Sequence, residues 1–380
     1  MEGNLPLNNN SIRVIISGGG TGGHIFPAIA IANALKKMNE KTDILFVGAQ
    51  GKMEMEKVPA AGYKIEGLWI SGLQRKLSIQ NLMFPVKVIS SVIKSYRLIN
   101  KFKPQVAVGV GGYASGPLLY AASRMGIPTI IQEQNSYPGI TNKFLAKKAD
   151  KICVAYSGME KYFPKNKIIV TGNPVRQDIQ NVEGKRIRGM EFFNLSENKR
   201  TLLIIGGSLG ARTINQSILN GLEKLVENGL QVIWQTGKAF YAQALEATKK
   251  FENSGVCAVD FISKMDYAYS VADAVISRAG AISISELCIV QKPCILVPSP
   301  NVAEDHQTKN ALAMVNHEAA ILIKDADAEA TLVNEIIALC SDKERSDKLK
   351  NNIAKLYTHN SAEAIANEVI ALAQKNIKTN

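Results

Sequence analysis

The sequence contains two similar stretches, one in each half of the chain. PQVAVGVGGYASGPLLYAA (104–122) leads to GIPTIIQEQN (126–135), and ADAVISRAGAISISELCIV (272–290) leads to QKPCILVPSP (291–300). Each stretch has the pattern of a strand, a glycine-containing turn, a helix and a further strand that is preceded by proline. Such a repeat predicts two related βαβ units in tandem.

The starts of the two halves also correspond, because IRVIISGGGTGGH (12–24) matches TLLIIGGSLGAR (201–212). A chain of 380 residues is long enough for two domains. Strands that alternate with helices favour a parallel sheet in each domain. We therefore predict an α/β chain with two Rossmann-like domains, 1–172 and 173–359, which meet near TGNPVR (171–176). A single large α/β domain is the alternative.

Composition narrows the class of partner and compartment. The formal net charge of +12 favours an anionic partner, which could be nucleic acid, a phosphorylated ligand or a membrane. The five cysteines are odd in number and lack CxxC spacing, which favours a reducing compartment. The polar start of the chain does not resemble a secretory signal, and no run of about 18 apolar residues predicts a membrane span.

Three glycine-containing loops follow predicted strands, at 18–23, 109–116 and 206–210. A loop that joins a parallel strand to a helix presents backbone N–H groups and a helix N-terminus, which together favour an anion. Glycine allows a ligand or another backbone to approach closely. The loops therefore predict phosphate binding, although tight turns alone would also explain the glycines.

The first loop satisfies the GxGxxG pattern through Gly18, Gly20 and Gly23. A dinucleotide site also needs an acidic residue at the end of the second strand, to bind the ribose. Here that strand ends in Ala49 and Gln50, which argues against a dinucleotide. GAQGKM (48–53) also lacks the length and the hydroxyl residue of a P-loop.

His24 is the strongest candidate for acid–base chemistry among the four histidines. It follows the first glycine loop at a helix start, and a general base needs such exposure and a pKa near neutrality. Local capping or packing is an equally good explanation. No HExxH motif or His/Cys cluster indicates a catalytic metal.

Other polar side chains follow predicted strands or begin predicted helices. Glu286 in RAGAISISE (278–286) could accept hydrogen bonds from a ribose diol, or be a solvated helix charge. Gln307 offers both a donor and an acceptor to sugar hydroxyls. EQN (133–135) comes just after a strand, and Arg176 follows the predicted domain boundary.

Apolar and basic residues alternate in the stretch 72–97, which includes Leu77, Leu82, Phe84 and Lys87. Apolar side chains beside basic ones fit a patch that lies on an anionic membrane surface. A core helix with a charged outer face fits the same pattern.

The motifs together resemble those of the MurG family of bacterial glycosyltransferases. The family's motifs occur in the same order and cover nearly the whole chain: GGGTGGH, GVGGYASGP, EQN with TNK, GNPVR, GGSLGAR, RAGAISISE and HQTKNA. The family adds N-acetylglucosamine to lipid I in peptidoglycan synthesis. Its GT-B fold has two Rossmann-like domains facing across a cleft and a C-terminal helix that returns to the first domain, here about 360–380.

The resemblance implies that the C-terminal half binds UDP-N-acetylglucosamine. The implied donor-binding residues are Thr21, Gly22, Gly23, Asn135, Arg176, Gly207, Ser208, Ile262, Gly280, Ala281, Ser283, Glu286 and Gln307. Some family members have a Gln-Gln pair where this chain has His306 and Gln307, so the resemblance supports Gln307 more than His306.

The resemblance places lipid I on the N-terminal half. It implies that His24 and Asn135 lie at the reaction centre. It also implies that the acceptor diphosphate meets Gly18, Gly19, Gly20, Gly111, Gly112 and Tyr113, and that 72–97 is the membrane patch.

The implied reaction is an inverting displacement in which the 4-hydroxyl of the muramyl sugar attacks the anomeric carbon and UDP leaves. His24 is expected to take the hydroxyl proton or to orient the acceptor. We expect no tightly bound cofactor and no structural requirement for a divalent cation. The resemblance further implies a peripheral position on the cytoplasmic side of the inner membrane, contact with anionic lipid, membership of a cell-wall synthesis or division complex, and no nucleic-acid partner.

Three rival functions fit parts of the sequence. The first is a related glycosyltransferase that acts on another lipid, for example diacylglycerol. The second is a UDP-N-acetylglucosamine 2-epimerase on a similar fold, which would not need a membrane patch. The third is a nucleotide-sugar-binding protein without catalysis, which would not need His24 and the acceptor loops.

Overall fold

A computed structural model describes residues 11–72, 83–207 and 209–379, and the chain in it divides into two compact units. Unit 1 comprises Met1–Val175 and Thr358–Asn380, and unit 2 comprises Arg176–Tyr357. These bounds differ by a few residues from the domain limits of 172 and 359 that the sequence suggested.

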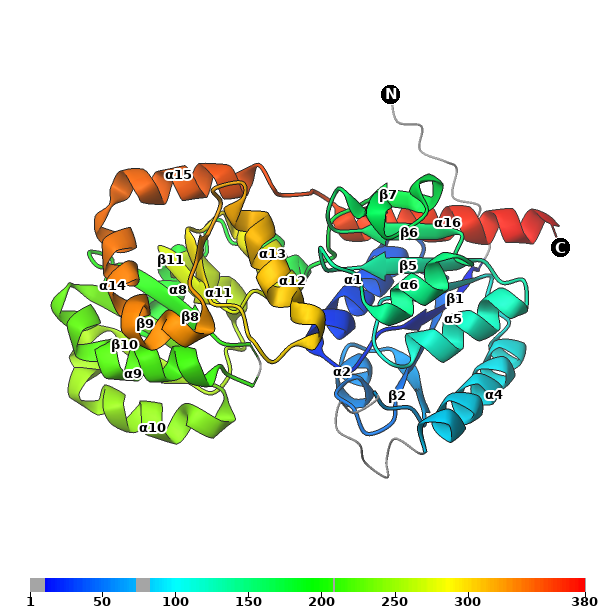
Figure 1. Ribbon diagram of the computed structural model, residues 1–380, viewed down its shortest axis with the longest axis horizontal. Coiled ribbons are helices and arrows are strands. Elements are labelled where there is room, and N and C mark those ends of the chain that lie inside the picture. The colour runs from blue at the N-terminus through cyan, green and yellow to red at the C-terminus, as the bar shows by residue number, and fades with distance from the viewer. Residues whose placement is uncertain (1–10, 73–82, 208, 380) are drawn as a thin grey trace. The chain divides into compact units, whose positions relative to one another are not determined.

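Unit 1 contains a seven-stranded parallel sheet in the order β3-β2-β1-β4-β5-β6-β7 (Figure 1). The strands are β1 (Arg13–Ser17), β2 (Asp43–Ala49), β3 (Lys64–Leu68), β4 (Val106–Gly109), β5 (Thr129–Glu133), β6 (Lys151–Val154) and β7 (Ile168–Val170). Its helices are α1 (Gly22–Met38), α2 (Glu54–Ala60), α4 (Phe84–Phe102), α5 (Ser115–Arg124), α6 (Ile140–Ala146) and α16 (Ser361–Thr379), with short 3₁₀ turns at Met159–Lys161 and Lys165–Lys167.

Unit 2 contains a six-stranded parallel sheet in the order β10-β9-β8-β11-β12-β13. The strands are β8 (Arg200–Ile205), β9 (Leu230–Gln235), β10 (Val256–Val259), β11 (Ala274–Ser277), β12 (Cys294–Leu296) and β13 (Ile321–Leu322). Its α-helices are α7 (Gln177–Gln180), α8 (Arg186–Phe193), α9 (Arg212–Glu227), α10 (Lys238–Thr248), α11 (Met265–Val271), α12 (Ala281–Val290), α13 (His306–Val315), α14 (Ala328–Ser341) and α15 (Lys343–Ala354). Three 3₁₀ segments lie at Lys249–Ser254, Ala303–Asp305 and Asp325–Asp327.

Both faces of each sheet are buried, as continuous apolar strands require. In β1, Val14 and Ile16 pack into one cluster and Ile15 packs into another on the opposite face. In β8, Leu203 likewise packs into one cluster and Leu202 packs into another. Helices therefore cover both faces of each sheet, which is the doubly wound arrangement.

The C-terminal helix α16 belongs to the core of unit 1. Its buried face joins the cluster that contains Val14, Ile16 and the helix α1, and consists of Ala362, Ile365, Ala366, Val369, Ile370 and Ala373. The chain thus crosses from unit 1 to unit 2 and returns for its last helix (Figure 1).

The predicted fold class, two Rossmann-like domains with parallel sheets, is confirmed. The two repeated stretches form equivalent elements, because β4–α5 and β11–α12 occupy the same place in the two strand orders. Helix α1 begins at Gly22, and Pro27 lies inside it.

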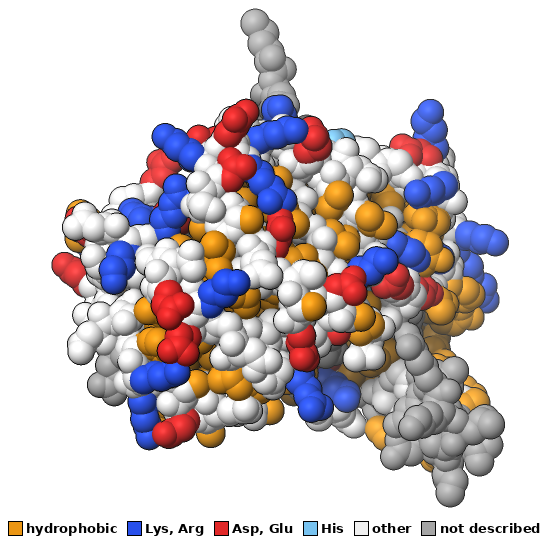
Figure 2. Space-filling model, turned by 60° about the vertical axis from the view of Figure 1, so that its left-hand side comes forward, with side chains coloured by type: hydrophobic (Ala, Val, Ile, Leu, Met, Phe, Trp, Pro, Cys, Tyr) orange, Lys and Arg blue, Asp and Glu red, His pale blue; other side chains and the backbone are white. Residues whose placement is uncertain are grey.

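The surface mixes charges of both signs. On the face drawn in Figure 2, acidic and basic side chains are interspersed among apolar ones over the described atoms. No helix in the described part of the chain combines the length and apolar character needed to cross a membrane.

Candidate active site

In unit 1, the loops that follow β1, β4 and β5 meet at the carboxyl edge of the sheet. Strand order reverses between β1 and β4, and such a switch point is where ligands bind in open α/β sheets. The buried Ser115 hydroxyl donates a hydrogen bond to either Ser17 O (3.0 Å) or Gly111 O (2.8 Å), which ties the first two loops together. Gln134 Nε2 donates to Val110 O (2.6 Å) and joins the third loop to the second.

Glycine is required where these loops touch. A Cβ on Gly112 would lie 2.3 Å from Gly19 O, and a Cβ on Gly111 would lie 2.5 Å from His24 Cδ2. Both Gly111 and Gly112 also have positive φ, which L side chains rarely adopt. The backbone of the second loop therefore packs directly on the first loop and on the His24 ring.

His24 lies in the first turn of α1 and is half-buried. Its Nδ1 is 3.1 Å from Gly19 O and 3.3 Å from Thr21 Oγ1. A carbonyl oxygen can only accept, so a neutral imidazole bonded to it carries its proton on Nδ1. Nε2 is then the unprotonated nitrogen, which is the state that a general base needs.

A buried carboxylate that the sequence did not single out lies beneath the first loop. Glu54, the first residue of α2, is fully buried and accepts from Gly20 N (2.9 Å) and Ala49 N (3.0 Å). A Cβ on Gly19 would lie 2.1 Å from Glu54 Oε1, and one on Gly48 would lie 2.5 Å from Glu54 Cγ. Gly19 is therefore needed for this internal contact whether or not a phosphate binds.

Asn135 is fixed by a second buried carboxylate, Glu133. Glu133 Oε1 accepts from the backbone N and from Nδ2 of Asn135, at 3.0 and 3.1 Å. Glu133 Oε2 accepts from Gly139 N and Asn142 Nδ2. Burial raises the pKa of Glu133, and the four hydrogen bonds oppose that rise. The carboxylate therefore determines the path of the loop 133–142 and the orientation of the Asn135 side chain.

Tyr113 lies at the rim of the loops in unit 1. Its ring is the nearest neighbour of Gly20, and a Cβ on Gly72 would lie 2.4 Å from its Cζ. About half of its surface is exposed. Thr21 is exposed, Gly22 and Gly23 begin α1, and Gly18 packs under the His24 backbone.

In unit 2, the loop after β8 is held by Gln235, which the sequence did not single out either. This buried side chain at the end of β9 donates from Nε2 to Gly207 O (3.0 Å) and accepts at Oε1 from Ile262 N (3.1 Å). The glycine loop and the residue Ile262 are thus fixed to each other through one amide. Ser208 lies outside the described residues.

The loop after β11 leads into the N-terminus of α12, next to β8 across the switch point of unit 2. Gly280 has extended backbone at the N-cap, Ala281 is buried and Ser283 is half-buried in the first turn. The first N–H groups of a helix have no partner within the helix, so they favour an anion. The position fits a phosphate group.

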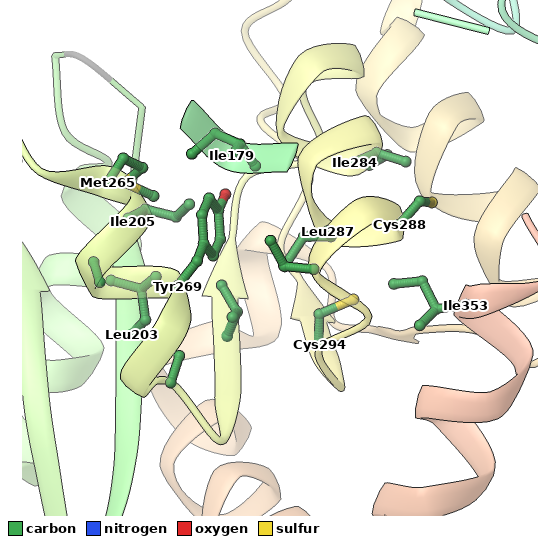
Figure 3. Packing of buried hydrophobic residues seen from close by; sticks show 14 of the residues in the cluster. Ile179, Leu203, Ile205, Met265, Tyr269, Ile284, Leu287, Cys288, Cys294 and Ile353 are labelled. Atoms are coloured by element: carbon green, nitrogen blue, oxygen red, sulfur yellow. The ribbon is translucent and has the colours of Figure 1, made fainter. Parts of the chain in front are cut away.

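Glu286 lies on α12 in an apolar setting. Tyr269 Oη donates to its Oε2 (3.0 Å), and Arg176 Nη2 is 3.5 Å from its Oε1. Figure 3 shows the Tyr269 ring among Leu203, Ile205 and Ile179. Burial raises the pKa of Glu286, and Arg176 opposes that rise, while burial and the Glu286 carboxylate raise the pKa of Tyr269 well above its usual value. Glu286 is therefore not a solvated helix charge.

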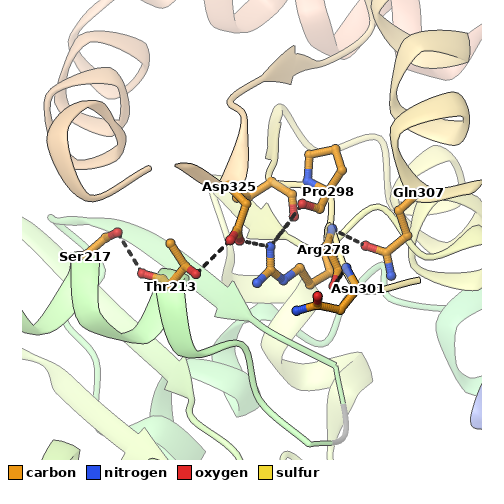
Figure 4. A network of polar contacts seen from close by, with 9 residues as sticks. Thr213, Ser217, Arg278, Pro298, Asn301, Gln307 and Asp325 are labelled. Atoms are coloured by element: carbon orange, nitrogen blue, oxygen red, sulfur yellow. Dashed lines mark hydrogen bonds and ion pairs between the residues drawn. The ribbon is translucent and has the colours of Figure 1, made fainter. Parts of the chain in front are cut away.

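A polar network holds the remaining loops of unit 2 (Figure 4). Arg278 Nη1 donates to Val297 O (3.0 Å), to Pro298 O (3.2 Å) and to the Asp325 carboxylate, which also accepts from Thr213 Oγ1 (2.9 Å). Gln307, in the first turn of α13, accepts from Ser299 N (2.8 Å) through its Oε1. That bond leaves Nε2 without a partner among the described residues. His306 begins the same helix.

The predicted membrane patch lies only partly within the described residues. Leu77 and Leu82 lie outside the described residues. Phe84 is half-buried, and the half-buried Lys87 donates from Nζ to Ser71 Oγ (2.9 Å). The apolar side chains exposed around α4 are instead Trp69, Met83, Val86, Ile89 and Ile93. Helical spacing places Val86, Ile89 and Ile93 on one face of α4, and this spacing in the sequence could have identified them.

Among the described residues, no cluster of three or more His, Cys, Asp or Glu side chains is arranged to hold a metal ion. The candidate residues fall into two groups, each gathered at the carboxyl edge of its own sheet. His24, Asn135 and Tyr113 belong to unit 1, and Arg176, Glu286 and the others from Gly207 to Gln307 belong to unit 2.

Two family models match the chain and divide it as the sheets do. The glycosyltransferase family 28 N-terminal domain matches residues 14–154, and the glycosyltransferase family 28 C-terminal domain matches residues 201–369. The chain belongs to glycosyltransferase family 28. The matched ranges contain all three glycine loops of this family 28 chain.

Curated relatives extend the match to nearly full length. The chain is 56% identical, over 363 residues, to the UDP-N-acetylglucosamine–N-acetylmuramyl-(pentapeptide) pyrophosphoryl-undecaprenol N-acetylglucosamine transferase of Parabacteroides distasonis. The alignment covers 96% of this chain and 99% of that relative. The protein of the same name from Phocaeicola vulgatus is 56% identical over 371 residues, which is 97% of this chain and 99% of the relative.

Among solved structures, MurG of Acinetobacter baumannii superposes on the family 28 chain with a TM-score of 0.75. It is 23% identical, and the match covers 95% of this chain and all of that chain. At this identity the likeness concerns the fold alone.

We expect Gln235→Leu to lower the free energy of unfolding of unit 2 by about 1–3 kcal/mol, because it removes the acceptor of Ile262 N and one of the two donors to Gly207 O, the other being Gly210 N. Urea denaturation, followed by the fluorescence of Trp234 in a Trp69→Phe background, reports on unit 2, which contains Trp234. Gln243→Leu, an exposed glutamine on α10, is the matched control. A midpoint for Gln235→Leu equal to that of the control would show that the amide bridge does not stabilise the loop.

Proposed function

We propose that this protein transfers N-acetylglucosamine from UDP-N-acetylglucosamine to the 4-hydroxyl of the N-acetylmuramyl sugar of lipid I, with inversion at the anomeric carbon. The observation that carries the proposal is the near-full-length similarity to transferases whose name states this donor and this acceptor. The product is lipid II, the precursor of cell-wall peptidoglycan.

Unit 2 binds the donor in this proposal. The Gly207 loop and the N-terminus of α12 flank the switch point of the sheet and offer N–H groups to the diphosphate. Gln235 supports this role because its Nε2 donates to Gly207 O and its Oε1 accepts from Ile262 N, so the amide accepts no N–H group from the described residues of the loop. Ile262 meets the uracil, and the Nε2 of Gln307 donates to a sugar hydroxyl.

Glu286 binds the ribose diol. Its carboxylate is held by Tyr269 and faces Arg176, so the charged form has a hydrogen-bond donor and a cation beside it. A buried carboxylate that accepts from two hydroxyls replaces the water it lost on burial. The 3.5 Å separation from Arg176 is an ion pair that nucleotide binding can loosen, which frees the guanidinium for the base of the nucleotide.

His24 is the general base. The C4 oxygen of the acceptor forms a bond to the anomeric carbon, and the bond from that carbon to the β-phosphate oxygen breaks with its electron pair leaving on UDP. The hydroxyl proton goes to His24 Nε2, which is the unprotonated nitrogen when Nδ1–H is bonded to Gly19 O. N–H groups and the helix dipole at α12 stabilise the charge on the leaving diphosphate. This mechanism uses no tightly bound cofactor.

Unit 1 binds the acceptor. Gly18, Gly111 and Gly112 bring the first two loops into contact, and N–H groups at the start of α1 are available to the acceptor diphosphate. Asn135, oriented by Glu133, binds the muramyl sugar. Tyr113 is exposed at the rim of the loops and covers the sugar by stacking.

A lipid acceptor requires access to the membrane surface. The exposed face of α4, defined by Val86, Ile89 and Ile93, is apolar, and Lys87 and Lys94 lie on the same helix. We propose that this face rests on the anionic inner leaflet, where apolar side chains enter the interface and lysines attract the head groups. The protein is then peripheral on the cytoplasmic side.

The experiment that tests the function uses the purified protein, labelled UDP-N-acetylglucosamine and a lipid I analogue in detergent. We expect label in the lipid product with inverted anomeric configuration, measured by extraction and NMR. Diacylglycerol is the control acceptor. Transfer to diacylglycerol but not to the lipid I analogue, or release of N-acetylmannosamine without any acceptor, would contradict the proposal.

We expect His24→Ala to lower kcat by about 10²–10⁴-fold, the usual contribution of a general base, while the affinity for UDP changes little. Steady-state kinetics measure kcat, and calorimetric titration with UDP measures affinity. His317→Ala, which removes a histidine of unit 2, is the control. Near-normal turnover of His24→Ala would remove this residue from the mechanism.

We expect the pair Ile89→Ser and Ile93→Ser to weaken binding to phosphatidylglycerol vesicles by roughly ten-fold or more, because each exposed isoleucine contributes apolar area at the interface. Sedimentation with the vesicles measures binding. The control pair is Ile187→Ser and Leu245→Ser, which changes equally exposed apolar residues of unit 2. Equal binding by the two pairs would refute the assignment of the α4 face.

A further inference from the structure

Two side chains form hydrogen bonds to opposite ends of the Gly19–Gly20 peptide. The N–H of Gly20 donates to Glu54 Oε2 (2.9 Å), and the C=O of Gly19 accepts from His24 Nδ1 (3.1 Å). These N–H and C=O groups belong to the same peptide bond. The carboxylate, the peptide and the imidazole therefore form one continuous chain of hydrogen bonds.

We propose that Glu54 is a positioning residue that acts on His24 through the Gly19–Gly20 peptide, in the role that a directly bonded carboxylate has in a histidine–carboxylate pair. The inference rests on the proposed role of His24 as general base and extends it. The negative charge at one end of the peptide increases the partial negative charge on Gly19 O, because hydrogen bonds in a chain polarise one another by about 10–30% per bond. A stronger acceptor at Nδ1 fixes the tautomer and stabilises the imidazolium that forms when Nε2 takes a proton.

The packing around Glu54 shows a carboxylate built into this position. It is fully buried, and both of its oxygens accept backbone N–H groups, from Gly20 and from Ala49. Any side chain at Gly19 or Gly48 would overlap it. Burying a carboxylate costs several kcal/mol unless it is paired, and in the described chain no cation forms a salt bridge with Glu54.

Two of the neighbouring loops contribute ionisable groups, Tyr113 and Glu133. The first turns of α1 and α5 contain no acidic residue. Tyr113 lies beside Gly20, and Glu133 is tied to Asn135, Gly139 and Asn142. Glu54 is therefore the carboxylate bonded to the peptide that His24 contacts, and removing its charge has a defined consequence for the imidazole.

The test is Glu54→Gln in the full-length protein, with Glu56→Gln, an exposed change on the same helix, as the matched control. We expect Glu54→Gln to lower kcat about 10- to 100-fold, which is less than the roughly 10⁴-fold cost of losing a directly bonded carboxylate, because a peptide intervenes. The KM for UDP-N-acetylglucosamine should change little, since the donor binds to unit 2. Glu54→Asp keeps the charge and should retain more activity than Glu54→Gln.

The pH profile separates this role from a structural one. A carboxylate at the end of the chain favours imidazolium, so its loss makes His24 less basic. The acidic limb of kcat against pH should then move to lower pH in Glu54→Gln and stay in place in Glu56→Gln. A purely structural role would lower kcat at all pH values without moving the limb, and that result would overturn the proposal.

A measurement on the unmodified protein covers the case in which Glu54→Gln does not fold. The ¹⁵N NMR shifts of the His24 ring, assigned with His24→Gln, should show a proton on Nδ1 and none on Nε2 at alkaline pH. The opposite tautomer would overturn the proposed action of Glu54 on His24. The outcomes also separate the two proposals. If His24→Ala is inactive and Glu54→Gln behaves as Glu56→Gln does, only the proposed action of Glu54 on His24 is wrong. If His24→Ala is active, the general-base assignment fails.

Discussion

In each unit, one pair of parallel strands at the centre of the sheet determines where chemistry can occur. β1 pairs with β4 in unit 1, and β8 pairs with β11 in unit 2, in equivalent registers. Because all strands run in the same direction, the loops after these strands lie at the same edge, and the reversal of strand order leaves a crevice between them. This pairing brings the glycine loops, the helix N-termini and the polar side chains of each site to one edge of its sheet.

The two units use the same topology but support their first glycine loop in opposite ways. In unit 1, the Glu54 carboxylate takes up the Gly20 N–H, so an internal anion lies where a dinucleotide-binding loop would direct N–H groups at its ligand. In unit 2, the Gln235 amide donates to the Gly207 carbonyl and accepts from Ile262 N, so it accepts no N–H group from the described residues of that loop. In our proposal the diphosphate therefore binds to unit 2, while the charge of Glu54 in unit 1 acts on His24.

Most of the fold could be predicted from the sequence because apolar strands, glycine turns and helices recur in matching order. Glu54 and Gln235 could not be predicted, since each is a polar residue in a short segment and only the tertiary structure brings it under a loop distant in sequence. The membrane patch stays a prediction; apolar density in the sequence indicates the stretch 72–97, and only the structure shows that Ile89 and Ile93 of this stretch are exposed on α4.

The central claim is that the uridine diphosphate of the donor binds to unit 2, and a crystal structure of the protein with UDP-N-acetylglucosamine tests it most directly. The account predicts density for the diphosphate at the Gly207 loop and the N-terminus of α12, with the ribose hydroxyls on Glu286. It also predicts that Glu54 keeps its bond to Gly20 N in that complex. Nucleotide density on the loop 18–23, with Glu54 displaced, would contradict the account.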